Sequence, residues 1–250
     1  MPAITRLAFF DLDGTLKAAR STYDYLHAQL GFSAQCEEYS AAFYRGEIDY
    51  VEWLRRDVAL WRGVPAARLE ALLRANPYLP GAPELVRLLL RAGVIVVIIT
   101  TGPDLHAHMV AQELGIQHVH ANRVETVAGV LTGRAETLVA EGDKGRLVER
   151  YQAQYATDAE HCMAVGDGMS DMDMFQRASL SIAVNPTTPA VAAAARIVLP
   201  TPDLTILPDI LQRLEPAWLN GRCATRSNRL SLIHISEPTR LLSISYAVFC

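Results

Sequence analysis

The hydrophobic pattern of this 250-residue chain predicts alternating strands and helices. Short apolar runs rich in β-branched and aromatic residues predict buried strands at residues 4–10, 94–99, 117–121, 162–165, 180–184 and 197–199. Helically spaced apolar positions lie between them, at residues 83–91, 104–114, 145–155 and up to 175. The run at 94–99 contains only valine and isoleucine, so we expect a central strand covered on both faces. This alternation predicts an α/β fold with a doubly wound parallel sheet.

A purely helical pattern follows the first predicted strand. Residues 21–44 carry helically spaced apolar positions but include Gly31, which favours two helices over one. Asp49 is suited to cap a helix over residues 50–61, and another helix is expected from residue 66 to residue 74. This segment, residues 17–78, therefore differs in periodicity from the rest of the chain.

Proline and glycine at residues 76–81 mark the clearest boundary in the chain. We therefore expect a small helical cap over residues 17–78, inserted into a core formed by residues 1–16 and 79–218. Glycines within residues 124–134 predict a hairpin in that core.

Residues 219–250 form a segment of different composition, first basic and polar and then mixed apolar and serine-rich. Residues 231–240 resemble a stretch that recurs in draft-genome translations as read-through of sequencing adapter. We hypothesise that residues 219–250 are a non-native or disordered tail. A real C-terminal hairpin is the alternative.

Composition limits the classes of partner and compartment. Half of the residues are hydrophobic and the net charge is −4, which supports a domain with a sizeable core and disfavours nucleic acid as a partner. No apolar run is long enough to span a membrane, and no signal peptide is expected before the first strand. The four cysteines, at positions 36, 162, 223 and 250, lack paired metal spacing. We therefore expect a cytoplasmic protein with free thiols. We also expect a monomer or homodimer.

Two carboxylates separated by one residue follow the first strand directly. Asp11 and Asp13 are succeeded by Gly14, which permits a tight turn, and by Thr15. Like charges this close are costly unless a proton or cation lies between them, so the pair suggests a nucleophile, a proton-transfer group and a hard metal ion. A plain turn is the alternative. A calcium loop is excluded because its downstream oxygen ligands are missing.

Polar groups also follow two other predicted strands. Thr100 and Thr101 end the run at 94–99 and precede a helix N-terminus, which suits an anion. Asp167 and Asp171 follow the strand at 162–165, and they can meet Asp11 because parallel strands end at one edge of a sheet. Lys144 opens a helix, where a cation is locally disfavoured, so we expect it to have an acidic or phosphate partner.

These motifs, in this order, resemble those of the haloacid dehalogenase-like hydrolases, and within them the phosphoserine-phosphatase-like branch. The resemblance covers residues 1–215 and rests on residues 11–15, 100–102, 144 and 166–171. It implies a Rossmann-like core, a helical cap over the site and a Mg²⁺-dependent phosphatase. Such a phosphatase would act on a small organic phosphate ester. Phosphoserine phosphatase proper, a phosphotransferase and a non-catalytic phosphate-binding protein remain the alternatives.

The resemblance also implies a role for each motif residue. Asp11 would attack phosphorus and become an aspartyl phosphate, and Asp13 would protonate the leaving oxygen and later deprotonate a water. Thr100, the Thr101 N–H and Lys144 would bind the phosphoryl group. Mg²⁺ would be held by Asp11, Asp167 and the backbone carbonyl of Asp13. Ser170 stands where the branch has asparagine, and Ser170 and Asp171 would support the site.

The chain departs from the branch at the residues that select the substrate. Phosphoserine phosphatases place a glutamate near the substrate ammonium, where an ungapped alignment has Arg20. They place a cap arginine near the substrate carboxylate, where the alignment has Asp57, with Arg56 one residue away. Because both charges are inverted, we expect phosphoserine not to be the best substrate.

Several other residues have a structural reading. His106 and His108 are expected to pack or to lie at the surface rather than to touch substrate. Phe43, Tyr50 and Trp53 fall at helical spacing and are expected to form cap core, with a substrate platform as the alternative.

Overall fold

The computed structural model describes residues 5–219. Residues 1–4 and 220–250 lie outside this part, and with them all but one residue of the predicted tail. Seven strands form one sheet in the order β4-β3-β2-β1-β5-β6-β7. Their bounds are β1 Leu7–Phe10, β2 Ile95–Pro103, β3 His118–Val127, β4 Val130–Glu136, β5 Cys162–Gly166, β6 Leu180–Val184 and β7 Ile197–Leu199. All neighbours are parallel except β3 and β4, which confirms the predicted α/β class with a largely parallel sheet.

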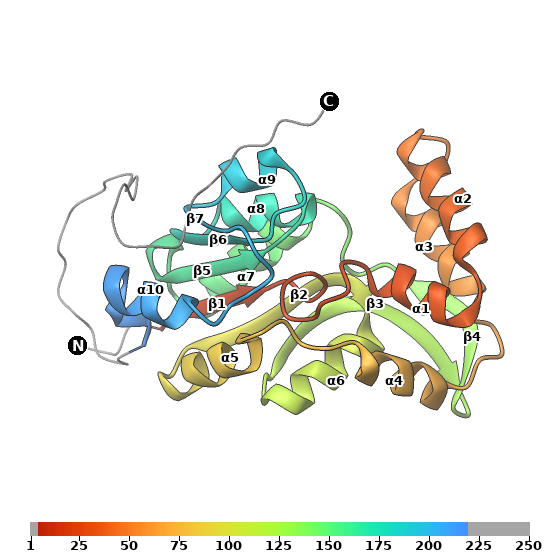
Figure 1. Ribbon diagram of the computed structural model, residues 1–250, viewed down its shortest axis with the longest axis horizontal. Coiled ribbons are helices and arrows are strands. Elements are labelled where there is room, and N and C mark those ends of the chain that lie inside the picture. The colour runs from red at the N-terminus through yellow and green to blue at the C-terminus, as the bar shows by residue number, and fades with distance from the viewer. Residues whose placement is uncertain (1–4, 220–250) are drawn as a thin grey trace.

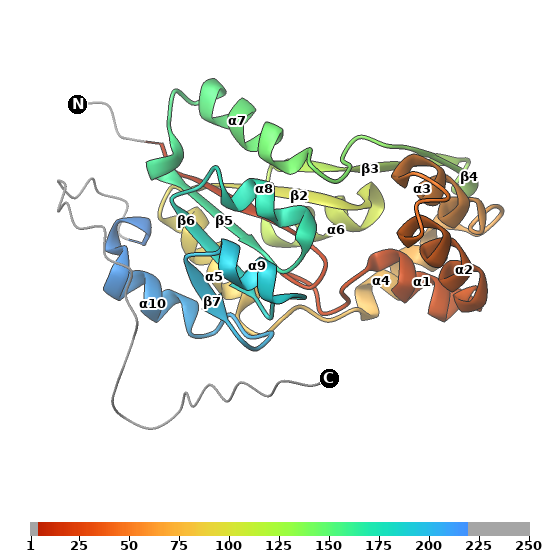
Figure 2. The same cartoon turned by 90° about the horizontal axis from the view of Figure 1, so that it is seen from above.

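Helices cover both faces of the sheet (Figure 1). Their bounds are α1 Thr22–Leu30, α2 Ser33–Tyr44, α3 Tyr50–Ala59, α4 Ala66–Ala75, α5 Ala82–Arg91, α6 Asp104–Leu114, α7 Lys144–Gln154, α8 Met172–Phe175, α9 Pro189–Ala194 and α10 Leu207–Leu214. One apolar cluster joins the sheet to α5, α6 and α10, and a second joins it to α7, α8 and α9. In Figure 2, α7, α8 and α9 lie on the side of the sheet opposite α5.

Strand β1 shows why its sequence must be apolar throughout. Leu7 and Phe9 belong to the cluster under α7 and α8, whereas Ala8 and Phe10 belong to the cluster under α5 and α6. Successive side chains of a strand point to opposite faces, so a strand with helices on both sides buries every residue. All four side chains are fully buried. The loop that follows β1 therefore starts from a rigid, central position.

Four helices, α1 to α4, lie between β1 and α5, where the sequence predicted helices. Gly31 ends α1 in the left-handed conformation, and the Asp49 side chain accepts a hydrogen bond from the Glu52 N–H at the start of α3, as expected. A third apolar cluster includes Leu54, Val58 and Trp61 of this segment together with Met109 of α6 and Val124 and Leu131 of the hairpin. The helices thus share their core with β3, β4 and α6. The exact division into core and cap stays a prediction.

Some predicted element bounds were wrong. Strand β2 does not end before Thr100 but continues to Pro103, with a break in its pairing to β3 after Ile99. The strand at 117–121 and the start of the hairpin are one continuous strand, β3. Helices α9 and α10 were not predicted. Helix α9 is alanine-rich without an apolar stripe, and its start depends on the Thr188 cap and Pro189.

Among residues 5–219, no helix is both long enough and apolar enough to cross a lipid bilayer.

Candidate active site

The predicted polar loops meet at one edge of the sheet because β1 lies between β2 and β5. A cleft of about 210 Å³ opens there between the sheet edge and helices α1 and α3. The sheet side contributes Asp11, Asp13, Thr100, Thr101, Gly102, Asp167, Gly168, Ser170 and Thr187. The segment containing α1 and α3 contributes Arg20, Ser21, Tyr23, Tyr50, Trp53, Leu54 and Asp57. The cleft therefore has an acidic floor and a largely aromatic opposite wall.

A buried lysine joins two carboxylates beneath the floor. Lys144 Nζ donates to Asp11 Oδ1 at 2.8 Å and to Asp171 Oδ1 at 2.6 Å, and neither Lys144 nor Asp171 is exposed. Burial alone would lower the pKa of Lys144, but the charges of Asp11 and Asp171 outweigh it and raise the pKa. Burial raises the pKa of Asp11 to about 7 in spite of Lys144. The partner expected for Lys144 is thus found, 133 residues away in the sequence from Asp11.

Asp171 holds the loop after β5 as well as Lys144. Its Oδ2 accepts hydrogen bonds from the N–H groups of Asp167 and Gly168, both at 2.9 Å. Gly166 makes this close packing feasible, because a Cβ there would lie 2.3 Å from Asp171 Cγ. Asp171 therefore orients Lys144 and Asp167 and has no free carboxylate oxygen.

The carboxylates of Asp11, Asp167 and Asp171 each offer an oxygen within 4.8 Å of the other two, an arrangement that can hold a metal ion. The pKa of Asp167 is raised to about 8, first by burial and then by the charges of Asp11 and Asp171. Three buried carboxylates face one lysine and one arginine, so a divalent cation would relieve their repulsion. Oxygen donors of this kind fit Mg²⁺. Because Asp171 is already occupied, Asp11 and Asp167 are the better ligands.

Asp13 is held by two hydrogen bonds from the start of α1. The Thr22 N–H donates to Asp13 Oδ2 at 2.8 Å, and the Thr22 hydroxyl donates to Oδ1 at 2.6 Å. His106 Nδ1 lies 2.7 Å from the Thr22 hydroxyl oxygen. Because the Thr22 hydroxyl gives its proton to Asp13, its oxygen can only accept a hydrogen bond from the His106 Nδ1–H. Burial raises the pKa of Asp13 to about 6, while both Thr22 bonds lower it.

Thr22 and His106 are the supporting residues that sequence reasoning missed. His106 is fully buried and its pKa falls to about 3, chiefly through burial, so the ring is neutral. The expectation that His106 packs within the protein holds, but the histidine also fixes the hydroxyl that binds Asp13. The spacing of Thr22 from Asp13 gave no sign of this contact, because it depends on how the chain turns before α1.

The break in pairing after Ile99 exposes the threonine loop to the cleft. Thr100 Oγ1 accepts a hydrogen bond from the Gly102 N–H at 2.9 Å, which leaves its own proton available to a ligand. The Thr101 carbonyl accepts from Tyr23, Tyr50 and Asn122 at 3.3, 3.1 and 2.8 Å. These three donors fix the loop. The role of Asn122 in clamping this loop appears only in the structure.

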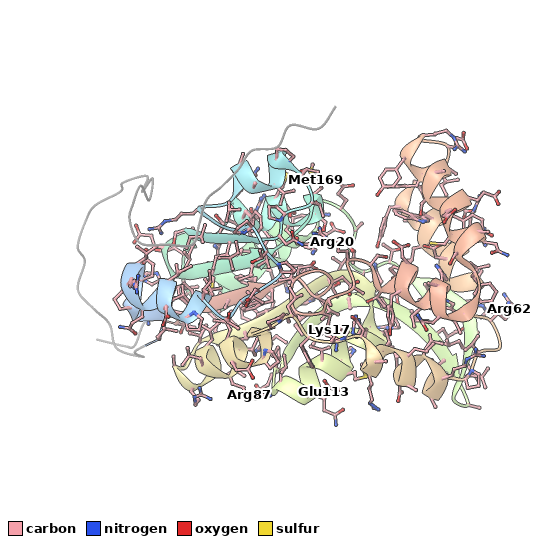
Figure 3. All side chains as sticks on the ribbon, in the orientation of Figure 1. Lys17, Arg20, Arg62, Arg87, Glu113 and Met169 are labelled. Atoms are coloured by element: carbon pink, nitrogen blue, oxygen red, sulfur yellow. The ribbon has the colours of Figure 1, made fainter. Side chains whose placement is uncertain are left out.

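The predicted specificity residues separate into two groups. Arg20 Nη1 lies 3.2 Å from Asp167 Oδ2, and its Nη2 donates to the Asn185 carbonyl at 2.8 Å. Figure 3 shows Arg20 on the side of the core that faces α2 and α3. Asp57 also lines the cleft, but Arg56 does not: it bonds Glu52 at 2.7 Å on the other side of α3. The structure thus brings Arg20 and Asp57 to the cleft and leaves Arg56 outside it.

The aromatic residues of α3 serve as core and as cleft wall together. Trp53 stacks on Phe43 with ring centroids 4.4 Å apart, and Tyr50 packs edge-on to both. Tyr50 and Trp53 nevertheless line the cleft, whereas Phe43 does not. The two readings considered from the sequence are therefore compatible.

Comparison with known proteins shows the family to which this chain belongs. The sequence model of the haloacid dehalogenase-like hydrolases matches residues 8–176, which carry all the motif residues described above. The chain belongs to the haloacid dehalogenase-like hydrolase family. Within this family it lies in the phosphoserine-phosphatase-like branch, as the relatives below show.

Two curated relatives are 34% identical to this haloacid dehalogenase-like hydrolase. Phosphoserine phosphatase SerB2 of Mycobacterium tuberculosis aligns over 80% of this chain and 48% of its own length, and the phosphoserine phosphatase of Archaeoglobus fulgidus over 72% and 52%. The chain thus spans about half the length of these curated relatives. A solved structure described as a phospho-aspartyl intermediate analogue of phosphoserine phosphatase superposes with a TM-score of 0.71 at 28% identity, covering 84% of this chain and 99% of that one.

Proposed function

We propose that this haloacid dehalogenase-like hydrolase is a Mg²⁺-dependent phosphomonoester hydrolase that acts through an aspartyl phosphate on a small organic phosphate. One observation carries the proposal: Lys144 Nζ holds Asp11 at 2.8 Å at the floor of a cleft that Thr100 and Asp13 also line. A carboxylate fixed by a buried lysine is positioned as a nucleophile rather than as a surface acid. The names of the relatives support the same reaction class.

In the first step, the Asp11 oxygen that Lys144 does not hold attacks phosphorus. The bond from phosphorus to the ester oxygen breaks, and Asp13 gives that oxygen its proton. A pKa raised to about 6 keeps part of the Asp13 population protonated near neutral pH, which suits an acid. The Thr100 hydroxyl and Lys144 stabilise charge on the phosphoryl oxygens.

In the second step, Asp13 takes a proton from a water that attacks the phosphorus of the aspartyl phosphate. The bond from phosphorus to the Asp11 oxygen breaks, which releases phosphate and restores both carboxyl groups. Thr22 orients Asp13 through two hydrogen bonds, and His106 orients the Thr22 hydroxyl. Both steps need positioning and charge neutralisation more than further chemistry.

Mg²⁺ would be held by Asp11, Asp167 and the backbone carbonyl of Asp13. When bound, it would neutralise charge on the phosphoryl oxygens and on Asp11. Asp171 and Ser170 would support this arrangement, Asp171 through its hydrogen bonds to the loop after β5 and Ser170 from its place on the cleft. Gly14 leaves room for Asp167, since a Cβ at residue 14 would lie 2.3 Å from its Oδ2.

Phosphoserine phosphatase is the second candidate, because the curated relatives carry that name. The cleft argues for a different small ester. Arg20 and Asp57 line it, and a substrate ammonium near Arg20 or a carboxylate near Asp57 would be repelled. We therefore expect L-phosphoserine not to be the best substrate.

The proposed setting of the protein is the cytoplasm, in keeping with the buried free thiols of Cys36 and Cys162. The proposed partner is a small molecule, and neither nucleic acid nor a membrane. The proposed oligomeric state is a monomer or homodimer.

Hydrolysis of p-nitrophenyl phosphate with Mg²⁺ tests the reaction. Asp11→Asn should lower kcat by about 10³-fold or more, because the nucleophile is lost. Asp209→Asn, the same change at an exposed site on α10, is the matched control and should leave the rate unchanged. Equal rates for the wild type and Asp11→Asn would remove the assignment of the nucleophile. Added alcohol acceptors distinguish a phosphotransferase, which would form new phosphate esters.

A further inference from the structure

One face of helix α3 forms the wall of the cleft opposite the acidic floor. Tyr50, Trp53, Leu54 and Asp57 line the cleft. Their spacing of three and four residues places them on a single helix face. Arg55 and Arg56 both donate hydrogen bonds to Glu52 on the rest of the helix surface. Asp57 is therefore the only charged side chain that α3 presents to the cleft.

The Asp57 side chain is buried, and one of its two carboxylate oxygens has no hydrogen-bond donor. Asp57 is 3% exposed, and its Oδ1 has no partner among residues 5–219. Burial and the charge of Asp24 raise the pKa of Asp57 to about 7. A buried acceptor without a donor is unfavourable, and a buried carboxylate beside a like charge is more so.

The polar neighbours of Asp57 cannot supply the missing donor. His27 Nε2 lies 3.2 Å from the Asp57 carbonyl oxygen, which can only accept, so the ring proton is on Nε2 and points to the backbone. The Cys36 thiol donates to Asp24 at 3.0 Å. Neither neighbour donates to the carboxylate in the described part of the chain. Asp57 lines the cleft, so the cleft is the side from which a further donor can reach this carboxylate.

The rest of this wall offers apolar surface. The hydroxyls of Tyr23 and Tyr50 are already bonded to the Thr101 carbonyl, so they are not free donors. Trp53 and Leu54 add aromatic and aliphatic area. Arg20 is engaged with Asp167 and Asn185 on the other side. A ligand group here meets one carboxylate and aromatic rings, which is the chemistry that binds a small organic cation.

We propose that Asp57 binds the ammonium group of the substrate, so that the preferred substrates are phosphate monoesters of small amino alcohols that lack a carboxylate. This inference rests on the proposed function, since the phosphate end must occupy the floor at Asp11. The cleft of about 210 Å³ is below the usual range of about 300–1,000 Å³ for drug-sized ligands, which limits the alcohol to a small one. A carboxylate on the substrate would face Asp57 without a compensating cation from α3.

Four phosphate esters of similar length test the wild-type protein: 2-aminoethyl, 2-hydroxyethyl, n-propyl and carboxymethyl phosphate. They differ only in the charge and hydrogen bonding of the distal group. We expect kcat/KM for the aminoethyl ester to exceed that for the propyl ester by about tenfold or more, with the hydroxyethyl ester between them and the carboxymethyl ester lowest. L-phosphoserine should fall below 2-aminoethyl phosphate.

The Asp57→Asn variant assigns the preference to one side chain. The ratio of kcat/KM for the aminoethyl ester to that for the propyl ester should fall by about tenfold or more. Two controls should keep the wild-type ratio: Glu52→Gln on the outer surface of α3, and Cys36→Ala, which lies near Asp57 but does not line the cleft. Circular dichroism with thermal melting checks that all variants fold.

The outcomes separate this inference from the proposed function. Hydrolysis of all four esters at equal rates overturns the inference and leaves the phosphatase assignment in place. Hydrolysis of no ester, including p-nitrophenyl phosphate, overturns the phosphatase assignment. Equal rates for the aminoethyl and hydroxyethyl esters reject a cation site. If Cys36→Ala loses the preference together with a bound metal ion, the carboxylate belongs to a metal site with His27 and Cys36, and the inference fails.

Discussion

The two walls of the cleft hold buried carboxylates in opposite ways. On the floor, Asp11 and Asp171 share the Lys144 ammonium, and the loop after β5 donates two further hydrogen bonds to Asp171. On the α3 wall, Asp57 Oδ1 has no donor among the described residues. Burial raises the pKa of Asp11 and of Asp57 alike, to about 7. The floor carboxylates are thus paired within the protein, whereas the α3 wall presents a carboxylate oxygen that no described residue pairs.

This difference between paired and unpaired buried carboxylates predicts which substitutions the protein tolerates. Removing one member of a satisfied buried ion pair leaves an uncompensated charge, which is strongly destabilising. Removing an unsatisfied buried carboxylate takes away a cost of folding. Changes on the floor should therefore damage activity and stability together, whereas a change at Asp57 should trade recognition of the substrate for stability.

The largest effect is expected from Lys144→Ala. The substitution leaves Asp11 and Asp171 buried without a cation, so the free energy of unfolding should fall by about 3–5 kcal/mol. Activity should fall by about 10³-fold or more, because the nucleophile and the phosphoryl oxygens lose their positive charge. Urea denaturation and p-nitrophenyl phosphate hydrolysis measure the two effects. Arg146→Ala, an exposed cation two residues along α7, is the control, and a similar loss there would break the comparison.

A smaller effect is expected from a single added methyl group in the loop after β5. A Cβ at Gly166 would lie 2.3 Å from Asp171 Cγ, whereas one at Gly168 would lie 3.8 Å from Asp171 Oδ2, an ordinary contact. Gly166→Ala should displace Asp171 from Lys144 and lower kcat by about 10²-fold, since small misplacements of catalytic groups are costly. Gly168→Ala should cost much less. Equal kcat values for the two variants would show that the position of Asp171 does not matter.

The smallest effect, and the one of opposite sign, is expected for the stability of Asp57→Asn. The folded-state pKa of Asp57 is about 7, above the ordinary 3.8, so the folded state binds this proton more tightly than the unfolded state. The wild type should therefore lose stability as pH rises from about 4 to 7, and the variant should lack this loss. Above about pH 7 the variant should be the more stable of the two proteins, with no difference below pH 4. Urea denaturation of both proteins across this pH range provides the measurement, and a variant that is less stable at pH 8 would contradict the comparison.

Much of the fold could be predicted from periodicity alone. The run at 94–99 has no polar position, which favours a strand covered on both faces, and Gly31 favours two helices over one; the structure has both. The errors occur where local pattern is weak. Helix α9 has no apolar stripe, and β2 continues past Ile99 because β3 resumes pairing with it at Pro103.

The candidate site was predictable to the extent that its residues sit at strand ends. Asp11, Asp13, Thr100 and Asp167 could be expected to converge, because parallel strands end at one edge of the sheet. Thr22 and His106 could not, because the contact between them joins the N-terminus of α1 to α6, 84 residues away.

By itself, the sequence determined the α/β alternation, the family motifs and the set of groups that meet at the sheet edge. These follow from local periodicity and from the order of strands, both of which a linear chain carries. Only the tertiary structure decided that Asp57 rather than Arg56 faces the cleft and that no donor reaches it. Adjacent residues on a helix differ by about 100° in direction, so a one-residue ambiguity in the sequence becomes a choice between a carboxylate and a guanidinium. The packing of α3 against the hairpin and α1 resolves that choice.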